Sequence, residues 1–301
     1  MSHTIYLPTF AAKKEDVQRQ LAILQEEVLQ KHPSTFDIGL EIGGLPKHFQ
    51  QGEHLEAIVD NMKSVAAGVK TIVHGFAGLA VYTEGISDMS NDEVGPKLLK
   101  TYIDLAKKLG SNYVHVHVHG SAGFQGIKPL ADKFDRLEKI RRNLINGMIN
   151  SEGIPIGLEN LPVPSCCDFY TDPKEVWSDC AQQPEDVQTV IQGTPLKFTF
   201  DTAHYGINKP GSIDLVKPVE GLKEHLYHLH VVDCTGFWKA NVSKAYDGSI
   251  PGDGRIGPDS FQKFFHYIRE NHPNLGMCIE VKNDPYYFRE GIRRVIKWLS
   301  E

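Results

Sequence analysis

The feature that most constrains the fold is an alternation of short apolar runs with longer amphipathic runs, which recurs eight times along the chain. A short apolar run bounded by Gly, Pro or Asn is typical of a buried strand, whereas apolar residues three or four positions apart predict a helix. The predicted strands are Thr4–Phe10, Phe36–Ile42, Thr71–Phe76, Asn112–His119, Ile154–Asn160, Leu196–Asp201, Leu226–Asp233 and Leu275–Val281.

A predicted helix follows each strand. Several of these helices carry end signals, such as Asn91 before a first turn, Gly110 after a last turn, and Asp-Pro pairs at helix starts. The predicted helices are Lys14–Gln30, His54–Ala67, Asp92–Leu109, Leu130–Ser151, one starting at Asp172 and Pro173, one around Ile213–Glu224, one from Gly257 and Pro258 through Asn271, and one from Asp284 and Pro285 through Leu299.

Eight strand–helix units without a linker-like break predict a single α/β domain over residues 1–301, folded as a (β/α)₈ TIM barrel. An open doubly wound sheet is the alternative. That fold usually carries a Gly-rich phosphate-binding turn after its first strand, and the residues Thr9-Phe10-Ala11-Ala12 offer no such turn. The barrel is therefore the preferred prediction.

Composition narrows the classes of partner. The chain has a formal net charge of −6 and no dense run of Lys or Arg, which disfavours a nucleic-acid-binding surface. No apolar stretch approaches the roughly 20 residues that span a bilayer, and the N-terminus lacks the pattern of a signal peptide. The five Cys show no Cys-x-x-Cys spacing, which indicates reduced thiols. We therefore expect a cytoplasmic protein with no membrane or nucleic-acid partner.

The predicted strand Ile154–Asn160 ends in a carboxylate that needs a partner. Its apolar residues alternate with Pro155, Gly157 and Glu159, so Glu159 faces the crowded barrel interior, and Gly157 leaves room beneath it. Burying an unpaired carboxylate costs several kcal/mol or shifts its pKa, so some group must compensate it.

Carboxylate and imidazole side chains also end most of the other predicted strands. Because active sites of such barrels lie at the C-terminal strand ends, these groups should converge on one rim. Mutual repulsion and desolvation then favour an organising cation over a purely structural polar cluster. The residues concerned are Glu41, His74, His115, His117, His119, Glu159, Asp201, His204, His228, His230, Asp233 and Glu280.

The predicted metal ligands come from four consecutive strands and are Glu159, Asp201, His230 and Glu280. Three carboxylates and one imidazole form an oxygen-rich set that suits one Mn²⁺, Mg²⁺ or Co²⁺ ion better than a thiolate-type zinc site, with Zn²⁺ as a further candidate. The deeper His115, His117 and His228 are predicted to form the wall around these ligands or to position them.

At these residues the chain resembles the xylose isomerase-like TIM-barrel superfamily, the sugar phosphate isomerase/epimerase group that includes endonuclease-four-type AP endonucleases. The resemblance spans all eight units and rests on five motifs. These are Gly-Leu-Glu-Asn (Glu159), Asp-Thr-Ala-His (Asp201 and His204), His-Val-Val-Asp (His230 and Asp233), the loop Pro-Gly-Asp-Gly-Arg-Ile-Gly (251–257) and Ile-Glu-Val (Glu280).

The resemblance implies one divalent metal on Glu159, Asp201, His230 and Glu280, with Glu159 and Glu280 also forming the catalytic acid/base pair. A metal that chelates adjacent carbonyl and hydroxyl oxygens acidifies the C–H between them and stabilises an enediolate. Two carboxylates then remove a proton on one face of the substrate carbon and return it on the other. The predicted substrate-binding residues are His204, Lys282, His119, His74, Trp238, Glu41 and Arg255.

The predicted activity is therefore a metal-dependent isomerase or epimerase in carbohydrate metabolism, acting on a sugar, sugar phosphate or keto-polyol. A dehydratase of a keto-polyol or dehydroshikimate-like substrate is the alternative, because it uses the same metal shell. An AP-endonuclease-like phosphodiesterase is disfavoured, since no His follows Asp247 where that group carries an Asp-x-His motif. A sugar-binding module without activity is disfavoured by the intact ligand set. The resemblance also implies a homo-oligomer.

Overall fold

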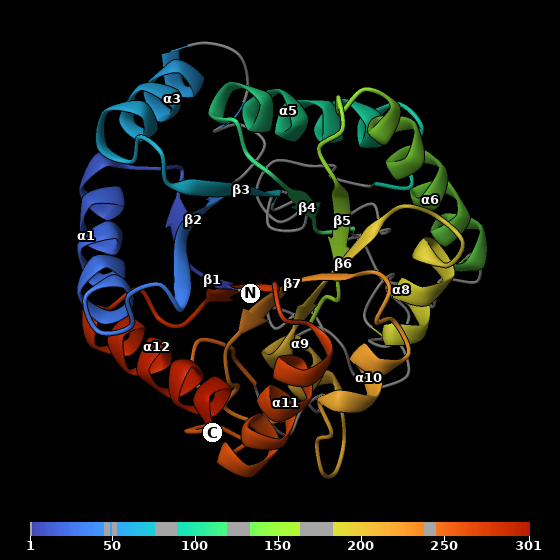
Figure 1. The fold of residues 1–301 in the computed structure, drawn as a ribbon. Helices are drawn as coiled ribbons and strands as arrows, with labels where there is room; N and C mark the ends of the chain where they lie inside the picture. Colours follow the sequence, from blue (N-terminus) through green and yellow to red (C-terminus); the bar gives the residue numbers. More distant parts are fainter. Residues whose placement is uncertain are drawn as a thin grey trace.

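The computed structural model describes residues 2–44, 49, 53–75, 89–118, 133–162, 183–237 and 245–301. Within these residues, eight strands form one closed barrel in sequence order, and each strand pairs in parallel with its neighbours (Figure 1). The predicted (β/α)₈ barrel is confirmed. The strands are β1 (His3–Phe10), β2 (Phe36–Gly44), β3 (Lys70–Gly75), β4 (Val114–Val116), β5 (Ile156–Glu159), β6 (Lys197–Asp201), β7 (Leu226–Val231) and β8 (Gly276–Ile279).

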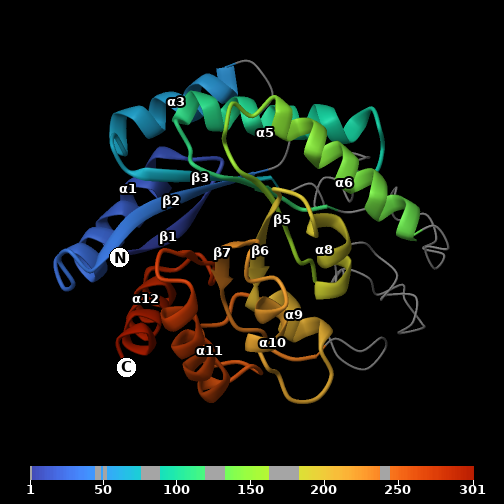
Figure 2. The same cartoon turned by 45° about the vertical axis from the view of Figure 1, so that its right-hand side comes forward.

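Helices surround the barrel as an outer ring, which Figures 1 and 2 show from two directions. Their buried faces pack on the outward-facing apolar residues of the strands and form the main hydrophobic core. The helical segments are α1 (Lys14–Leu24), η1 (Gln25–Leu29), α3 (Glu53–Val65), α5 (Val94–Leu109), α6 (Lys133–Ile149), α8 (Pro184–Ile191), α9 (Thr202–Asn208), α10 (Val216–Glu220), α11 (Pro258–Asn271) and α12 (Pro285–Ser300).

The first helix departs from its prediction at Gln25, where the α-helix gives way to one π-helical segment, η1. This segment directs the buried carboxylate of Glu27 toward helix α12. Arg293 donates to both Glu27 oxygens at 2.9 Å, and Arg289 donates at 3.0 Å. Two guanidinium groups on one carboxylate therefore join the first and last helical units of the ring.

Two other helices differ from the prediction after β6 and before β7. Asp201 accepts a hydrogen bond from the backbone N–H of His204 at 2.6 Å and so starts the short helix α9, which the sequence did not predict. The helix predicted around Ile213–Glu224 is only α10, because Asp214 caps the N–H of Val216 at 3.0 Å. The helix predicted from Asp172 lies outside the described residues.

The interior of the barrel is filled differently near its two ends. Near the N-terminal strand ends, Tyr6, Ile72, Tyr113 and Cys278 form a small buried cluster. Gly157 makes room for this layer, since a Cβ at that position would lie 1.9 Å from the Tyr113 hydroxyl oxygen. Above this layer, toward the C-terminal strand ends, the interior is occupied by carboxylates and imidazoles. None of the helices in the described residues combines the length and the apolar composition of a membrane-spanning segment.

Candidate metal centre

The C-terminal ends of β5 to β8 bring the four predicted metal ligands together. Glu159, Asp201, His230 and Glu280 each offer one ligand atom, and these atoms all lie within 4.8 Å of one another. The first three side chains are fully buried or nearly so, whereas the Glu280 side chain is 26% exposed. We call these four residues the rim group. It is enclosed by protein but reachable at Glu280.

His230 lies at the centre of the rim group and faces its carboxylates with Nδ1. This nitrogen is 2.8 Å from Glu280 Oε2, 3.3 Å from Glu159 Oε1 and 3.5 Å from Asp201 Oδ2. One imidazole N–H can satisfy only one of these oxygens at a time. Three carboxylates therefore face a single possible hydrogen-bond donor, the Nδ1–H group of His230.

Several polar atoms of the rim group lack a hydrogen bond among the described residues. Both oxygens of Glu159, Oδ2 of Asp201 and Nδ1 of His230 are buried, and none has a partner with acceptable hydrogen-bond geometry. Burying such groups without a partner is costly, so these atoms are suited to binding an ion or water. A divalent cation would bind three carboxylate oxygens and an imidazole lone pair at this position, so the donor set fits the predicted metal.

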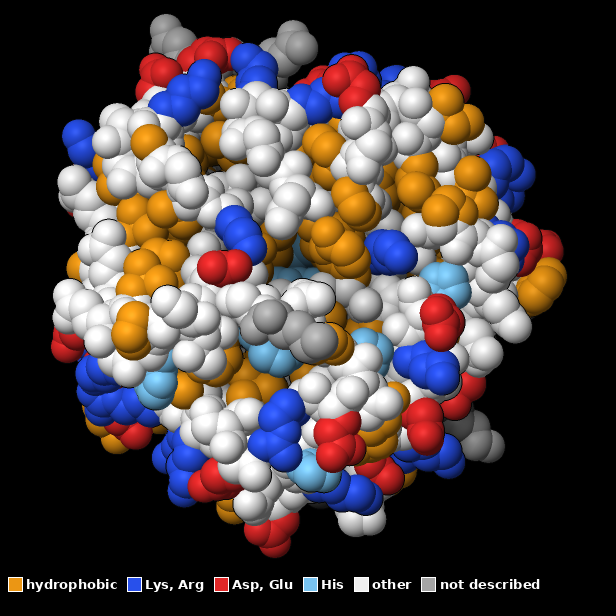
Figure 3. Space-filling view, in the orientation of Figure 1, with side chains coloured by type: hydrophobic (Ala, Val, Ile, Leu, Met, Phe, Trp, Pro, Cys, Tyr) orange, Lys and Arg blue, Asp and Glu red, His pale blue; other side chains and the backbone are white. Residues whose placement is uncertain are grey.

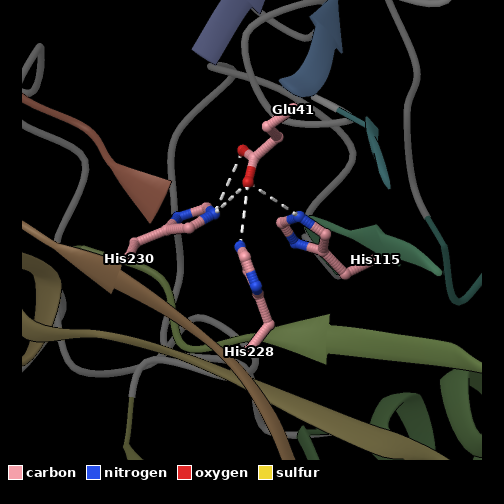
Figure 4. A group of neighbouring side chains, drawn as sticks. All are labelled: Glu41, His115, His228 and His230. Atoms are coloured by element: carbon pink, nitrogen blue, oxygen red, sulfur yellow. Dashed lines mark hydrogen bonds and ion pairs between the residues drawn. The ribbon is translucent and has the colours of Figure 1, made fainter. Parts of the chain in front are cut away.

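Glu41 was predicted to contact substrate, but it lies below the rim group with a relative exposure of only 1%. His74 Nδ1 lies 2.8 Å from Glu41 Oε1, and His228 Nε2 and His230 Nε2 lie 3.0 and 3.2 Å from Oε2 (Figure 4). The Glu41 carboxylate thus binds three imidazoles. Glu41 therefore positions these imidazole rings and is not exposed at the open rim of the barrel.

Further imidazoles surround Glu159. His74 Nε2 lies 3.1 Å and His117 Nε2 lies 3.4 Å from Oε2, and His204 Nδ1 lies 3.0 Å from Oε1. His74 and His204 were predicted to bind substrate, and the structure places both against a rim carboxylate. His117 was predicted as a wall residue, and it is a direct neighbour of Glu159 with its side chain 13% exposed.

The charged groups around Glu159 and His230 shift the pKa values of these two residues in opposite directions. Burial raises the pKa of Glu159, but the charges of His230, His117 and His74 outweigh it and hold that pKa well below its usual range. Burial lowers the pKa of His230, but Glu159, Glu280 and Glu41 raise it well above its usual value. The structure therefore favours an ionised Glu159 next to positively charged imidazoles. A metal cation bound here would stabilise the Glu159 carboxylate in the same way.

A neighbouring residue that the sequence did not single out, Asn160, fixes the position of Asp201. The Asn160 side chain donates to the Asp201 carbonyl at 2.9 Å and accepts from the Asp201 N–H at 2.8 Å. The backbone carbonyl oxygen of Asn160 lies 3.0 Å from His204 Nδ1. An Asn that directly follows a predicted ligand could have indicated this role.

Asp233, from the His-Val-Val-Asp motif, organises the glycine-rich loop instead of binding with the rim group. Its carboxylate accepts backbone N–H groups from Cys234, Gly252, Gly254, Ile256 and Gly257 at 2.7 to 3.3 Å. A Cβ at Gly254 would lie 2.5 Å from Asp233 Oδ1, so that position requires glycine. The motif therefore shapes the loop that follows the metal-facing strand.

The other predicted substrate contacts are placed differently. The Arg255 guanidinium donates to the carbonyls of Gly206 and Gly211 at 2.6 and 2.7 Å, so it holds backbone segments rather than substrate. Lys282 is exposed, and its Nζ lies 5.5 Å from the centroid of the Tyr287 ring rather than inside the barrel. His119 and Trp238 lie outside the described residues.

One known protein family matches most of the chain. A family model described as "Xylose isomerase-like TIM barrel" matches residues 42–301. The chain belongs to this family. The matched residues include β3 to β8, and thus every residue of the rim group. A search of curated protein sequences found no significant match.

Proteins of this fold with solved structures cover the chain almost completely at low identity. L-ribulose 3-epimerase is 14% identical with a TM-score of 0.64, and the match covers 100% of this chain and 95% of that chain. A 3-keto-D-glucoside 4-epimerase from E. coli is 16% identical, with a TM-score of 0.60 and 99% coverage of both chains. Endonuclease IV from Thermus thermophilus is 15% identical, with a TM-score of 0.61 and 98% coverage of both. These similarities show the fold.

Proposed function

We propose that this protein is a divalent-metal-dependent epimerase or isomerase of a sugar, sugar phosphate or keto-polyol. The observation that carries the proposal is the rim group, in which three carboxylates and one imidazole converge within 4.8 Å at the C-terminal end of the barrel. This is the end at which active sites of the fold are found. The family assignment and the similarity to two sugar epimerases support the same reading.

Glu159, Asp201, His230 and Glu280 would hold the metal. When bound there, a divalent cation would polarise neighbouring carbonyl and hydroxyl oxygens of a substrate and so acidify the C–H between them. The surrounding imidazoles keep the carboxylates oriented, since Glu159 lies within 3.0 to 3.4 Å of nitrogen atoms of His74, His117 and His204. Such supporting contacts fix ligand geometry.

The proton-transfer groups that we propose are the carboxylates of Glu159 and Glu280. Glu159 is buried at the end of β5, and neighbouring positive charge keeps its pKa low, so it is available as a proton acceptor at neutral pH. Glu280 follows β8 and is 26% exposed, so it approaches the site from a different part of the rim. One of the two groups, as a carboxylate, would remove a proton from the substrate carbon, and the other, as a carboxylic acid protonated from solvent, would return a proton to the opposite face.

The test is a panel of ketoses, sugar phosphates and keto-polyols incubated with the protein and Mn²⁺ in D₂O, followed by NMR. The expected result is an epimer or isomer that carries deuterium from solvent, without loss of water. A dehydrated product would instead assign the dehydratase reaction that uses the same kind of site. Glu159→Gln should abolish exchange, whereas Glu185→Gln, at an exposed position of α8, should not change it. Equal turnover by wild type and Glu159→Gln would refute the proposal.

A further inference from the structure

We propose that the barrel contains a second metal site beneath the rim group, formed by Glu41, His115, His228 and Nε2 of His230. We call these four residues the deep group. Their ligand atoms also lie within 4.8 Å of one another, and all four side chains are buried. The proposed function requires only the rim ion, so this site goes beyond it.

The three imidazoles of the deep group surround the carboxylate of Glu41, a residue of β2. Figure 4 shows His115, from β4, and His228 and His230, from β7, directing a ring nitrogen toward this carboxylate. Glu41 Oε2 lies 3.0 Å from His228 Nε2, 3.2 Å from His230 Nε2 and 3.7 Å from His115 Nε2. Three separate imidazoles therefore converge on one oxygen atom.

These separations match the size of a tetrahedral metal shell. Ligand atoms about 2.0 to 2.1 Å from a zinc ion lie about 3.4 Å apart at tetrahedral angles. The distances from Glu41 Oε2 to the three ring nitrogens are 3.0, 3.2 and 3.7 Å, so two are shorter than 3.4 Å and one is longer. A cation could thus be accommodated with small side-chain movements.

His115 gives an independent reason to expect a ligand. It is fully buried, and neither of its ring nitrogens makes a hydrogen bond among the described residues. A neutral imidazole carries one N–H and one lone pair, and leaving both unsatisfied in the interior is costly. A cation bound to Nε2 would use the lone pair. The remaining N–H, on Nδ1, would then face Glu159 Oε2 at 3.6 Å, as in carboxylate–histidine–metal arrangements.

The donor set indicates a different metal from that of the rim. Three imidazoles and one carboxylate suit tetrahedral Zn²⁺, whereas the oxygen-rich rim group suits Mn²⁺, Mg²⁺ or Co²⁺. His230 belongs to both groups, with Nε2 toward Glu41 and Nδ1 toward Glu280. A neutral imidazole has one lone pair. If both sites used His230 at the same time, its remaining ring proton would have to leave to solvent.

A cavity at the opposite end of the barrel reaches one member of the deep group, His228. A cavity of about 720 Å³ opens at the N-terminal strand ends, and Tyr6, Lys70, Asn112 and His228 are among its lining residues. Figure 3 looks onto this end and shows imidazole side chains within the hollow at its centre. Gly276 keeps this region open beside His228, because a Cβ there would lie 2.8 Å from His228 Nδ1.

The test loads metal-free protein with one equivalent of Zn²⁺ and records the zinc content and the zinc X-ray absorption spectrum. The expected spectrum of the wild type shows at least two imidazole ligands. Glu41→Gln should weaken zinc binding by more than about 100-fold, because it removes a ligand rather than an outer partner. Glu280→Gln, which leaves all four residues of the deep group unchanged, should retain the imidazole-rich spectrum and so excludes a site on Glu41, His74, His230 and Glu280. Glu159→Gln should also retain it, which excludes a site on Glu159, His74 and His115.

A wild-type spectrum with one imidazole or none would overturn the deep site, as would unchanged zinc affinity in Glu41→Gln. If the Glu41→Gln protein failed to fold, the spectra of the wild type and of Glu159→Gln would still test the site, because a spectrum that lost its imidazole ligands in Glu159→Gln would place the zinc on Glu159, His74 and His115 instead. Failure of the deep site is distinguishable from failure of the proposed function. In the first case Mn²⁺-dependent deuterium exchange persists, whereas in the second case it is absent from the wild type.

Discussion

Nδ1 of His230 lies 2.8 Å from Oε2 of Glu280, and this contact joins the buried interior of the barrel to its open rim. Glu280 is the member of the rim group with an exposed side chain, at 26%, whereas His230 is completely buried. A substrate or a solvent-borne cation can therefore reach the group at Glu280 first.

Glu280→Gln should lower both Mn²⁺ affinity and solvent deuterium exchange while leaving the fold intact. The amide keeps the shape of the side chain but removes the anionic oxygen next to His230. We expect a loss of activity of at least about 100-fold, the lower range for a group that transfers a proton. The measurement is the exchange rate at saturating Mn²⁺. An exchange rate equal to that of the exposed control Glu185→Gln would show that Glu280 has no catalytic part.

Asn160→Ala should destabilise the protein and weaken metal binding together. The change removes two buried hydrogen bonds to the Asp201 backbone, at 2.8 and 2.9 Å. Leaving the backbone groups unsatisfied should cost about 2 to 4 kcal/mol of unfolding free energy. Urea denaturation gives this quantity, and Asn150→Ala, at an exposed position near the end of α6, provides the control. Full stability with normal Mn²⁺ affinity would refute the positioning role of Asn160.

Gly157→Ala should be destabilising because of one specific collision. A Cβ at position 157 would lie 1.9 Å from the Tyr113 hydroxyl oxygen and 2.8 Å from the Lys197 carbonyl oxygen. We expect a loss of about 1 to 3 kcal/mol or more, as for other overpacked interiors. Tyr113→Phe removes the nearer atom and should restore part of the loss. A double-mutant cycle without any coupling energy would contradict this explanation.

Glu27→Gln should reduce stability in a pH-dependent manner. Burial raises the pKa of Glu27, but hydrogen bonds from Arg293, Lys31 and Arg289 outweigh it and lower the pKa from 4.5 to about 2. A carboxyl group with a lowered pKa stabilises the fold above its unfolded pKa, and this contribution disappears as the pH falls from 4.5 toward 2. The shift corresponds to at most about 3 kcal/mol.

The measurement for Glu27 is the difference in unfolding free energy between wild type and Glu27→Gln at several pH values. This difference should be largest above about pH 5 and should shrink as the pH falls. The control is Glu26→Gln, whose side chain is 49% exposed and contacts Arg289 from the solvent side. A difference that is constant between pH 3 and pH 7 would rule out the charged pairing as its source.

The sequence was sufficient to predict the barrel because each of its units shows a clear period and several helices carry end signals. It also predicted the four rim residues as neighbours, because consecutive parallel strands must present their C-terminal ends at one edge. The metal-binding and catalytic roles of these residues stay predictions. Within a strand, the period of two indicates which face a residue occupies but not how deep it lies. Glu41 was therefore expected at the substrate, whereas its carboxylate is buried among the imidazoles of His74, His228 and His230.

The surroundings of two predicted substrate-binding residues, Arg255 and Lys282, could not be predicted because they depend on contacts between distant segments and on where a strand ends. Arg255 lies in a recognisable motif, yet its guanidinium binds carbonyls of Gly206 and Gly211, more than 40 positions away. Lys282 has the alternation expected of an inward-facing residue, but β8 ends at Ile279, so the alternation no longer applies. Glu27, in the π-helical segment Gln25–Leu29, likewise accepts hydrogen bonds from Arg289 and Arg293 of the last helix.

The most direct test of the rim metal site is a Mn²⁺ titration followed by electron paramagnetic resonance, comparing wild type with Asp201→Asn. Asp201 is buried beside Glu159 and His230, and its Oδ2 has no hydrogen-bond partner among the described residues. We predict that the wild type binds Mn²⁺ at the rim and that Asp201→Asn weakens this binding by at least about 100-fold while the fold is retained. Equal Mn²⁺ binding by the two proteins, or no binding by the wild type, would contradict the rim metal site.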